Sequence, residues 1–412
     1  MGHKLAITLS ILYILISTAA ANRISVRATS GNDPIKLALQ QAADGDTIMV
    51  YQGHYDVSNL QIDKQVVMIG VNYPVLDGNH RDALLNVRAD NVTISGFNLQ
   101  NAGISYINDN AAIRLDSVKN CTVANNRLRN NFFAIYLARV ENCVVSHNQI
   151  ESNPLRETSA GNGIHLWYCK NVRITDNTVK GHRDGIYFEF VQEGLVEGNI
   201  SERNLRYGLH FMFSDHCRYQ KNTFRNNGAG VAVMYTKHVV MTDNIFEYNW
   251  GPASFGILLK EISDSDISGN RFTHNSTGLY SEGSTRLKIE HNLFEYNGWA
   301  VKVMANSMDN LFSANDFISN SFDVATNSRQ NFNTFDANYW HKYTGYDLNR
   351  DGVGDVPFRP VGLFSLIVEK QHPALVLLNS FFVDLLEISE RIFPVLTPKT
   401  LVDNNPRMRR SH

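Results

Sequence analysis

Short segments in which apolar and polar residues alternate recur along the chain, and most of them open with a glycine. Five of these segments read GIHLWY (163–168), GIYFEF (185–190), GLHFMF (208–213), GVAVMY (230–235) and GILLKE (256–261). Alternation with a period of two predicts β-strands that bury one face. The same apolar positions occur earlier, at Ile113, Leu115, Ile135 and Leu137. We therefore expect many short strands that stack their apolar faces into one interior.

An asparagine recurs at a nearly constant spacing and gives the length of one repeat. The successive gaps are 22, 29, 22, 23, 22, 26, 22, 23 and 23 residues. The positions, called the anchor asparagines below, are Asn126, Asn148, Asn177, Asn199, Asn222, Asn244, Asn270, Asn292, Asn315 and Asn338. A fixed period near 22 residues with short strands is typical of a solenoid. The chain is therefore predicted to be all-β, a right-handed parallel β-helix with coils of ~22–23 residues.

Two kinds of residue are expected at the corners of each coil. The recurrent glycine at the start of the alternating segment supplies either a positive φ or room for close backbone approach. The anchor asparagines are expected to tolerate the left-handed conformation and to stack their amides on the next coil. Both roles are structural rather than catalytic.

The two ends of the repeat predict different elements. Residues 34–43 have a helix-forming composition with an early Pro34, and predict a helix that caps the open first coil. The solenoid and this cap are expected over residues 22–346. Residues 359–412 contain an apolar run at 373–386 that predicts a helical segment. That segment either caps the solenoid or docks on a membrane or a membrane protein.

Composition adds a location and excludes one class of partner. Lys4, the apolar stretch 5–16 and the small residues 19–21 predict an export signal over residues 1–21, with a membrane anchor as the alternative. The formal net charge of −2 gives no electrostatic reason to expect nucleic acid as a partner. Cys121 and Cys143 occupy the same slot of adjacent coils, so they form either a disulfide or a stacked pair of core thiols.

The outward positions of four consecutive strands carry an unusual set of side chains, which we call the His–Met belt. Its members are His165, Trp167, Tyr187, Glu189, His210, Met212, Ala232 and Met234. Met212 and Met234 share a column on adjacent coils, roughly 4.8 Å apart. Thioether and imidazole groups suit Cu(I). The belt is therefore a copper site using His210, Met212, Met234 and His165, a docking surface without metal, or ordinary packing beneath a loop.

Two insertions lengthen the coil at the same corner, over residues 151–162 and 249–255. They flank the four coils of the belt and are expected to form the sides of a slot, as loops on a rigid scaffold often do. Contacts with a partner protein are expected from Trp167, Tyr187, Glu189 and Trp250. His216 and His238 also stack on adjacent coils and are a second metal candidate, with isolated surface histidines as the alternative.

Residues 347–358 resemble a calcium-binding loop. Asp347, Asn349, Asp351 and Asp355 alternate with other residues, and Gly352 stands at the sixth place. The twelfth position is Phe358 instead of glutamate, which excludes a full EF-hand. The segment is therefore a degenerate Ca²⁺ loop or a set of Asx turns.

Catalysis is not expected. The tripeptide 182–184, His-Arg-Asp, is also found in fragments of sugar-cleaving enzymes, but a corner before a glycine accounts for it. No pair of outward carboxylates on neighbouring coils offers the acid and base that glycoside hydrolysis requires.

The chain resembles the NosD family of periplasmic β-helix proteins, which act in the maturation of nitrous oxide reductase during denitrification. The segments that carry the resemblance are 53–55, 67–70, 208–213, 231–235, 337–340 with 347–357, 363–365 and 393–396. The resemblance implies a periplasmic scaffold or copper-handling component without enzymatic activity. Its implied partners are an ABC transporter, a membrane-anchored copper chaperone and nitrous oxide reductase, so that partners associate the protein with the inner membrane.

The resemblance also implies that residues 359–412 contact the membrane subunit of the transporter. It does not imply which residues hold copper. The alternative is a secreted β-helix protein that binds or cleaves uronate-type polysaccharides, since the coil pattern alone is shared with that broad group.

Overall fold

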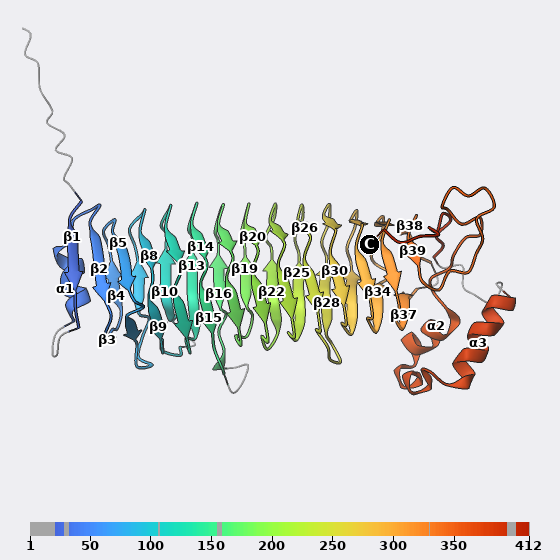
Figure 1. The fold of residues 1–412 in the computed structure, drawn as a ribbon, viewed down its shortest axis with the longest axis horizontal. Coiled ribbons are helices and arrows are strands. Elements are labelled where there is room, and N and C mark those ends of the chain that lie inside the picture. The colour runs from blue at the N-terminus through green and yellow to red at the C-terminus, as the bar shows by residue number, and fades with distance from the viewer. Residues whose placement is uncertain are drawn as a thin grey trace, which may run out of the picture.

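The chain folds into a parallel β-helix, as predicted (Figure 1). The computed structural model describes residues 21–28, 33–105, 108–154, 159–328, 330–393 and 401–411. In this part, three parallel sheets of 14, 13 and 12 strands run the length of the solenoid, and each complete coil contributes one strand to each sheet. Each strand therefore pairs with its counterpart one coil earlier and one coil later.

We call the sheets A, B and C. Sheet A contains β1 (Arg23–Val26), β2 (Thr47–Tyr51), β5 (Val67–Val71), β8 (Thr93–Ser95), β11 (Thr122–Ala124), β14 (Val144–Ser146), β17 (Arg173–Thr175), β20 (Leu195–Glu197), β23 (Arg218–Gln220), β26 (Val240–Thr242), β29 (Asp266–Ser268), β32 (Lys288–Glu290), β35 (Leu311–Ser313) and β38 (Thr334–Asp336).

Sheet B contains β3 (His54–Asp56), β6 (Val75–Asp77), β9 (Asn98–Gln100), β12 (Arg127–Arg129), β15 (Gln149–Glu151), β18 (Thr178–Lys180), β21 (Ile200–Glu202), β24 (Thr223–Arg225), β27 (Ile245–Glu247), β30 (Arg271–Thr273), β33 (Leu293–Glu295), β36 (Asp316–Ile318) and β39 (Tyr339–Trp340).

Sheet C contains β4 (Leu60–Ile62), β7 (Leu85–Val87), β10 (Ala111–Asp116), β13 (Phe133–Ala138), β16 (Ile164–Trp167), β19 (Ile186–Glu189), β22 (Tyr207–Met212), β25 (Ala229–Met234), β28 (Phe255–Lys260), β31 (Thr277–Glu282), β34 (Trp299–Val303) and β37 (Phe322–Ala325). The alternating segments of the sequence fall in this sheet.

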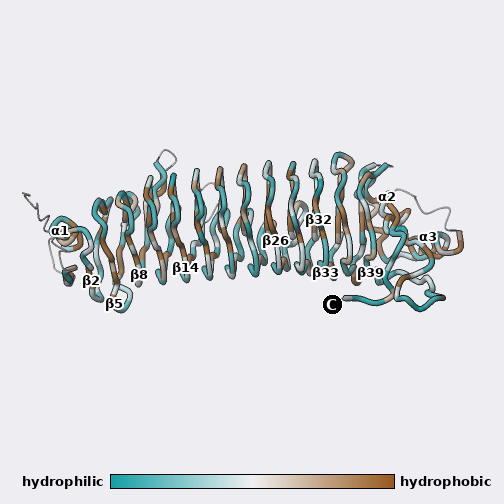
Figure 2. The backbone as a smooth tube through the Cα atoms, turned by 90° about the horizontal axis from the view of Figure 1, so that it is seen from above, coloured by the Kyte–Doolittle hydropathy of each residue, from teal (hydrophilic) through white to brown (hydrophobic). Residues whose placement is uncertain are grey.

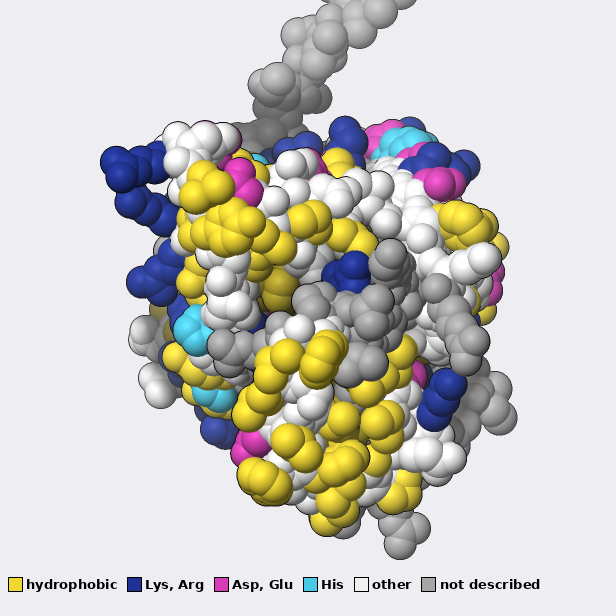
Figure 3. Space-filling model, turned by 90° about the vertical axis from the view of Figure 1, so that its right-hand side faces the viewer, with side chains coloured by type: hydrophobic (Ala, Val, Ile, Leu, Met, Phe, Trp, Pro, Cys, Tyr) yellow, Lys and Arg dark blue, Asp and Glu magenta, His cyan; other side chains and the backbone are white. Residues whose placement is uncertain are grey.

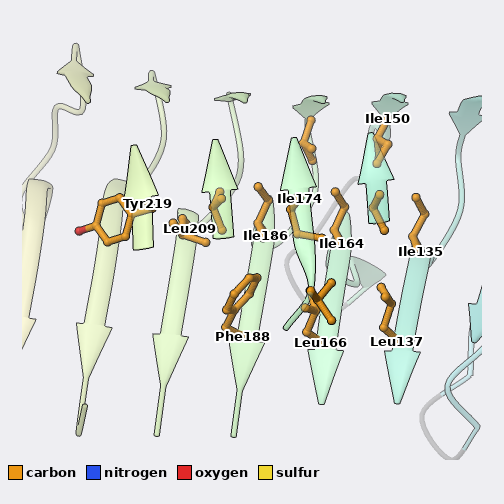
Figure 4. Packing of buried hydrophobic residues seen from close by; sticks show 14 of the residues in the cluster. Ile135, Leu137, Ile150, Ile164, Leu166, Ile174, Ile186, Phe188, Leu209 and Tyr219 are labelled. Carbon is orange, nitrogen blue, oxygen red and sulfur yellow. The ribbon is translucent and has the colours of Figure 1, made fainter. Parts of the chain in front are cut away.

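The interior is a set of stacked columns of apolar side chains. Figure 4 shows Ile135, Ile164, Ile186 and Leu209 at equivalent positions of successive coils, and all four are fully buried. A column of phenylalanines continues the core beneath sheet B, with neighbouring ring centroids 4.6 to 5.6 Å apart. Each coil buries its apolar surface only against its neighbours, so the stability of the fold depends on continuous stacking.

The anchor asparagines form a continuous ladder inside one corner. Asn199 is representative, because its Nδ2 donates to Oδ1 of Asn222 at 3.0 Å and to the carbonyl of Ile174 at 2.8 Å. Its backbone N–H donates to the same Oδ1 of Asn222 at 2.9 Å. The expected stacking of amides is therefore present.

The expectation of a left-handed conformation at the anchors was wrong. The residue before the anchor adopts it instead, as at Lys221 (φ 55°) and Asp243 (φ 56°). This shift leaves the anchor side chain pointing inward, where its amide can reach the next coil. The glycine at the start of the alternating segment is needed because the backbones of neighbouring coils approach closely there. A Cβ on Gly208 would lie 2.6 Å from the carbonyl oxygen of Gly230.

A second asparagine ladder lies at the following corner. Its members come five residues after successive anchors and are Asn204, Asn227, Asn249, Asn275, Asn297 and Asn320. This ladder was not predicted above, although its members follow the anchor asparagines at a constant offset of five residues in the sequence. From Asn204 to Asn320, two ladders at neighbouring corners link successive coils by side-chain hydrogen bonds.

A helix covers the first coil, as expected. Helix α1 (Pro34–Gln41) begins at Asp33, whose side chain accepts a hydrogen bond from the N–H of Lys36 at 3.0 Å. Ile35 is fully buried against the core of the first coils. The expected export signal lies almost entirely in residues 1–20, outside the described part of the chain.

The C-terminal segment, expected as one unit over 359–412, has two parts in the structure. Helix α2 (Leu363–Lys370), the 3₁₀ helix η2 (His372–Leu377) and helix α3 (Phe381–Ile392) project beside the last coils. Residues 401–411 then return and lie against the end of the solenoid (Figure 2). No helix in the described residues is long and apolar enough to cross a membrane.

The four cysteines are buried free thiols in the structure, so Cys121 and Cys143 form a stacked pair without a disulfide. The backbone N–H of Cys121 lies 3.4 Å from Sγ of Cys143, as expected for a stacked column of core thiols.

Candidate functional site

The register of sheet C arranges the His–Met belt in two columns on the outer face. One column runs from Trp167 through Glu189 and Met212 to Met234. The other runs from His165 through Tyr187 and His210 to Ala232. The methionines are thus direct neighbours on β22 and β25.

Aromatic stacking holds the second column together. The ring of His165 lies between Tyr136 and Tyr187, with centroid distances of 4.6 and 4.8 Å and interplanar angles of 7° and 23°. Asn162 Nδ2 lies 2.9 Å from Nδ1 of His165, so the amide donates to an unprotonated Nδ1. Burial lowers the pKa of His165 to about 3, which keeps the ring neutral at physiological pH.

His210 is more enclosed than the sequence suggested. The sequence predicted an outward side chain at the surface, but His210 is only 4 % exposed. Its ring packs edge-on against Tyr187, with ring centroids 4.9 Å apart, and at a tilt of 58° against Tyr207, with centroids 4.8 Å apart. This enclosure corrects the interpretation of an open belt, because aromatic rings from the preceding coil and from its own strand cover the imidazole.

Neither ring nitrogen of His210 has a hydrogen-bond partner among the described residues. A buried polar atom without a partner carries a free-energy cost, and such cases call for a functional or structural reason. Burial lowers the pKa of His210 to about 3. The imidazole is therefore neutral at pH 7 and keeps a nitrogen lone pair available for a metal ion.

The methionine pair sits beside this histidine on the same strand face. The hydroxyl of Tyr187 lies 3.5 Å from Sδ of Met212 and donates to it. Met212 and Met234 are both partly buried, and Lys260 follows Met234 in the column. On the other side, burial raises the pKa of the Glu189 carboxyl. The belt thus combines soft sulfur, neutral imidazole and a carboxylate within four coils.

A buried polar group lies at the start of the same strands. Asp184 is fully buried, and its carboxylate accepts hydrogen bonds from Nε of Arg183 and from the N–H of Tyr207, both at 3.3 Å. Burial raises the pKa of Asp184. Nε2 of His182 and Oδ1 of Asn162 likewise have no hydrogen-bond partner in the part of the chain that the structure describes. The tripeptide 182–184 therefore forms the corner before Gly185, as expected, and His182 and Asp184 are buried in that corner.

The two insertions lie where expected, between strands of sheet B and sheet C. The first separates β15 from β16 and the second separates β27 from β28. Residues 155–158 of the first fall outside the described part of the chain. Trp250 in the second is 65 % exposed. Trp167 is partly buried, with Tyr168 packed edge-on at 4.8 Å and the guanidinium of Arg139 5.4 Å from its ring.

An aromatic ladder that was not predicted from the sequence borders the belt, and all of its members except the half-buried Phe190 are exposed. Tyr168, Phe190, Phe213 and Tyr235 follow the four belt strands directly and stack with centroids 4.5, 5.2 and 5.2 Å apart. All four adopt the left-handed conformation, which turns the rings outward at the corner. The recurrence of an aromatic residue directly after each belt strand is the sequence pattern that could have predicted this ladder. Together with the belt, this ladder makes a broad edge rich in aromatic side chains.

A polar hollow of about 260 Å³ lies on the same sheet, toward the N-terminus. Among its lining residues are Asn86, Asp109, Arg114 and Asp116. The register places Arg114 in the column that continues through Tyr136 to His165. The hollow and the belt therefore share one face of the solenoid.

The loop over residues 347–358 is folded around its acidic side chains. Asp347 accepts hydrogen bonds from the N–H groups of Asp351 at 3.2 Å and Gly352 at 3.0 Å. Asp355 accepts from the N–H of Leu348 at 2.7 Å. Gly352 has a φ of 88°. Asx turns are present at Asn349 and Asp351, whose side chains accept hydrogen bonds from the N–H groups of Asp351 at 3.2 Å and of Val353 at 2.8 Å. Within the described residues, no group of three or more His, Cys, Asp or Glu is arranged to hold a metal ion.

Comparison with known proteins identifies the family. A family model described as "Periplasmic copper-binding protein (NosD)" matches residues 147–345, which include the whole belt. A "Probable ABC transporter binding protein NosD" from Pseudomonas aeruginosa is 30% identical over 401 residues, covering 93% of this chain and 92% of the relative. The chain belongs to the NosD family. A second NosD, from Stutzerimonas stutzeri, is 28% identical over 355 residues, 81% of this chain and 80% of that protein.

Solved structures share only the fold with this NosD chain. A family 28 exopolygalacturonase from Yersinia enterocolitica aligns with a TM-score of 0.55 and 11% identity over 77% of this chain and 78% of its own. A lacto-N-biosidase from Eubacterium ramulus gives 0.54 and 11%, over 76% and 68%. These matches confirm the parallel β-solenoid and carry no information on sugar binding. The NosD relatives are named as transporter binding proteins rather than enzymes.

Proposed function

We propose that this protein is a periplasmic scaffold that holds Cu(I) on the His–Met belt and works with an ABC transporter. The proposal extends the family description, which is copper-binding and periplasmic, to named residues of this chain. Its further partners are a membrane-anchored copper chaperone as donor and nitrous oxide reductase as recipient. These two partners rest on the family resemblance, whereas the copper residues rest on the geometry.

One observation carries the copper assignment. His210 is 4 % exposed, and neither of its ring nitrogens has a hydrogen-bond partner in the described residues. On the same face of its strand lies Met212, with Met234 paired to it on the next coil. A neutral imidazole beside two thioethers is a ligand set that selects Cu(I) over harder ions.

The partial burial of these ligands suits a Cu(I) ion that the protein takes up and then passes on. The enclosing rings of Tyr187 and Tyr207 limit access of water to His210, which protects Cu(I) from competing ligands. Met212 and Met234 are only partly buried, so a donor protein can approach the methionine pair. His165 lies two coils away from His210 in the same column and can extend the path. Copper is thus the cargo, and the belt supplies successive ligands.

A donor or recipient protein would dock on the edge beside the belt. The ladder Tyr168, Phe190, Phe213 and Tyr235 offers rigid aromatic surface next to the methionine column. Trp167, Tyr187 and Glu189 lie within the belt, and Trp250 stands on the second insertion. Aromatic residues that lose little side-chain freedom on binding are favoured at such interfaces.

The transporter would bind at the other end, on helix α3. Phe381, Leu385, Ile388 and Ile392 recur at the spacing of one helix face and are 80, 49, 48 and 63 % exposed. Figure 3 looks onto this end, where hydrophobic side chains gather. An exposed apolar face of this kind fits the membrane subunit of an ABC transporter, partly within the lipid headgroup region.

An anaerobic titration tests the proposal. The tag-free mature protein (22–412) is titrated with Cu(I) against a chromophoric chelator, beside a variant with His210, Met212 and Met234 changed to Ala. Tight binding by the parent and a loss of at least tenfold in affinity by the variant are expected. A matched control changes Met308, which is exposed and far along the solenoid, to Ala and leaves binding unchanged.

Equal affinity of the parent and the triple variant would overturn the belt as the site. Absence of binding by the parent would overturn the proposed copper role of this chain and leave the belt as a docking surface. Circular dichroism of the triple variant confirms that the coils remain folded.

A further inference from the structure

His216 and His238 form an exposed pair on the corner that follows sheet C. Their ring centroids lie 4.8 Å apart and the ring planes are inclined by 36°. Both residues adopt the left-handed conformation, with φ of 56° and 55°. Because each follows a belt strand by the same number of residues, the two side chains leave equivalent backbone positions on adjacent coils.

We propose that these two imidazoles form a second metal site, for a divalent ion that prefers nitrogen ligands, Cu²⁺ foremost. Nothing in the family description or in the names of the relatives assigns it. The site does not depend on Cu(I) binding by the belt, so either site can fail without the other.

The geometry fits two nitrogens on one ion. A metal–imidazole bond is about 2.0–2.1 Å long, so two nitrogens on opposite sides of an ion lie about 4 Å apart and nearer when the angle is smaller. The two rings are tilted with centroids 4.8 Å apart, so corresponding nitrogens lie at a similar spacing. The nitrogen lone pairs lie in the ring planes, and rotation of the two exposed side chains turns one nitrogen of each ring toward a shared ion. The backbone needs no change, since both corners are fixed by the coil.

The neighbouring charged groups are already paired and leave the imidazoles as the ligands. Asp264, next in the column after His238, binds Arg286 through two contacts of 2.6 and 2.7 Å. Glu193 occupies the position equivalent to His216 on the preceding coil, and its Oε1 lies 3.7 Å from Nζ of Lys170. Asp215 accepts a hydrogen bond from the N–H of Lys237 at 2.9 Å. The pair therefore supplies two protein ligands, and water completes the coordination of the ion.

The chemistry of this pair differs from that of the belt. Met212 and Met234 lie four residues before His216 and His238 on the same two coils, at most about 14 Å along the chain. Phe213 and Tyr235, stacked 5.2 Å apart, stand between the two pairs. Imidazole accepts Cu²⁺ and Zn²⁺, and Cu²⁺ is the tightest-binding divalent ion of its series, whereas thioether selects Cu(I). One edge of two adjacent coils thus carries two sites of different preference.

An aerobic titration with CuCl₂ tests this second site. Tag-free protein 22–412 is titrated in a weakly coordinating buffer near pH 7.5 and followed by electron paramagnetic resonance. The expected result is one bound Cu²⁺ with nitrogen hyperfine structure from two imidazoles. His216→Gln and His238→Gln each weaken binding at least tenfold. Zn²⁺ competes for the same site.

The matched control is His274→Gln. His274 also has a left-handed φ, of 53°, and its ring stacks between neighbours, but these are Tyr248 and Tyr296 instead of a second histidine. This variant binds Cu²⁺ like the parent. The belt variant that lacks His210, Met212 and Met234 also keeps Cu²⁺ binding, which separates the two proposals.

Two results would overturn the second site. One is equal Cu²⁺ affinity in the parent and in both single variants. The other is a spectrum in which only one imidazole nitrogen couples to the copper. Because both histidines are exposed, substitution to glutamine leaves the fold intact, and far-ultraviolet circular dichroism verifies this.

Discussion

Asp403 ends the anchor ladder by accepting the hydrogen bonds of Asn338. Its Oδ2 receives the backbone N–H of Asn338 at 3.0 Å and the side-chain amide at 3.1 Å. The indole Nε1 of Trp340 donates to the same oxygen at 2.9 Å. In earlier coils, Oδ1 of the next anchor fills this place. A carboxylate that comes 65 residues later therefore completes the last coil.

Removal of this carboxylate should destabilise the end of the solenoid. Asp403→Ala removes the acceptor of three hydrogen bonds and leaves the backbone N–H of Asn338 and the indole N–H of Trp340 without a partner, at a cost of about 1–3 kcal/mol for each group. Hydrogen exchange in β38 and β39 should accelerate, and the thermal midpoint should fall. Asp403→Asn keeps an acceptor oxygen and should lose much less. Equal effects of the two substitutions would contradict the capping role.

The ladder itself should be the most sensitive part of the fold. Asn199→Ala removes the acceptor of Asn177 and the donor to Ile174 and Asn222, so we expect a loss of about 3 kcal/mol or more. Urea unfolding measures the loss. The exposed amide Gln192 is the control, and Gln192→Ala should change stability by less than about 0.5 kcal/mol. A similar midpoint for both variants would refute the ladder as a structural element.

Stability should fall as the pH drops below about 6.5. Burial lowers the pKa of His210 to about 3 and of His182 to about 4, whereas both rings have a pKa near 6.5 in the unfolded chain. Between these values the unfolded state binds protons that the folded state does not, so the free energy of unfolding rises with pH. Thermal midpoints from pH 4.5 to 7.5 measure this slope.

The variant His210→Phe tests the contribution of that single group. It keeps an aromatic ring at the position and removes the titration, so the decline toward acidic pH should be shallower than in the parent. An unchanged slope would mean that His210 does not titrate as its burial requires.

The apolar face of α3 should be needed for binding to the transporter. Changing Phe381, Leu385 and Ile388 to Ser should abolish co-purification with the cognate ABC transporter in detergent, while the solenoid keeps its circular dichroism spectrum. Leu37→Ser alters an exposed leucine on the opposite cap and should leave capture intact. Undiminished capture of the α3 variant would exclude this face as the contact.

Calcium should stabilise the loop over residues 347–358 if its carboxylates bind the ion. Isothermal titration and the thermal midpoint in millimolar Ca²⁺ are compared for the parent and Asp351→Asn, which keeps the side-chain acceptor of the Val353 N–H but removes a charge. We expect stabilisation of the parent and a weaker effect in the variant. Identical behaviour without added heat of binding would leave the loop as Asx turns only.

Much of the architecture could be predicted because it repeats. The period of Asn126 to Asn338 and the alternation in the glycine-led segments determine coil length, strand placement and register, since each coil meets only its neighbours. The columns that bring Met212 beside Met234 follow directly from that register. The second asparagine ladder was equally visible, at a fixed offset from the first.

Features that depend on non-repeating contacts could not be predicted. The enclosure of His210 arises from how the rings of Tyr187 and Tyr207 turn, which no spacing encodes. The return of Asp403 to Asn338 joins segments separated by three helices. The left-handed residue lies one place before each anchor because the anchor amide must point inward. This position follows from packing and not from the preference of asparagine for the left-handed conformation.

X-ray absorption at the copper K-edge of the Cu(I)-loaded protein tests the central assignment most directly. The parent should show sulfur scatterers together with imidazole nitrogen, and a variant with Met212 and Met234 changed to Leu should lose the sulfur contribution while it keeps its fold. A spectrum of the loaded parent with nitrogen and oxygen neighbours alone would contradict the belt as the place where this protein holds copper.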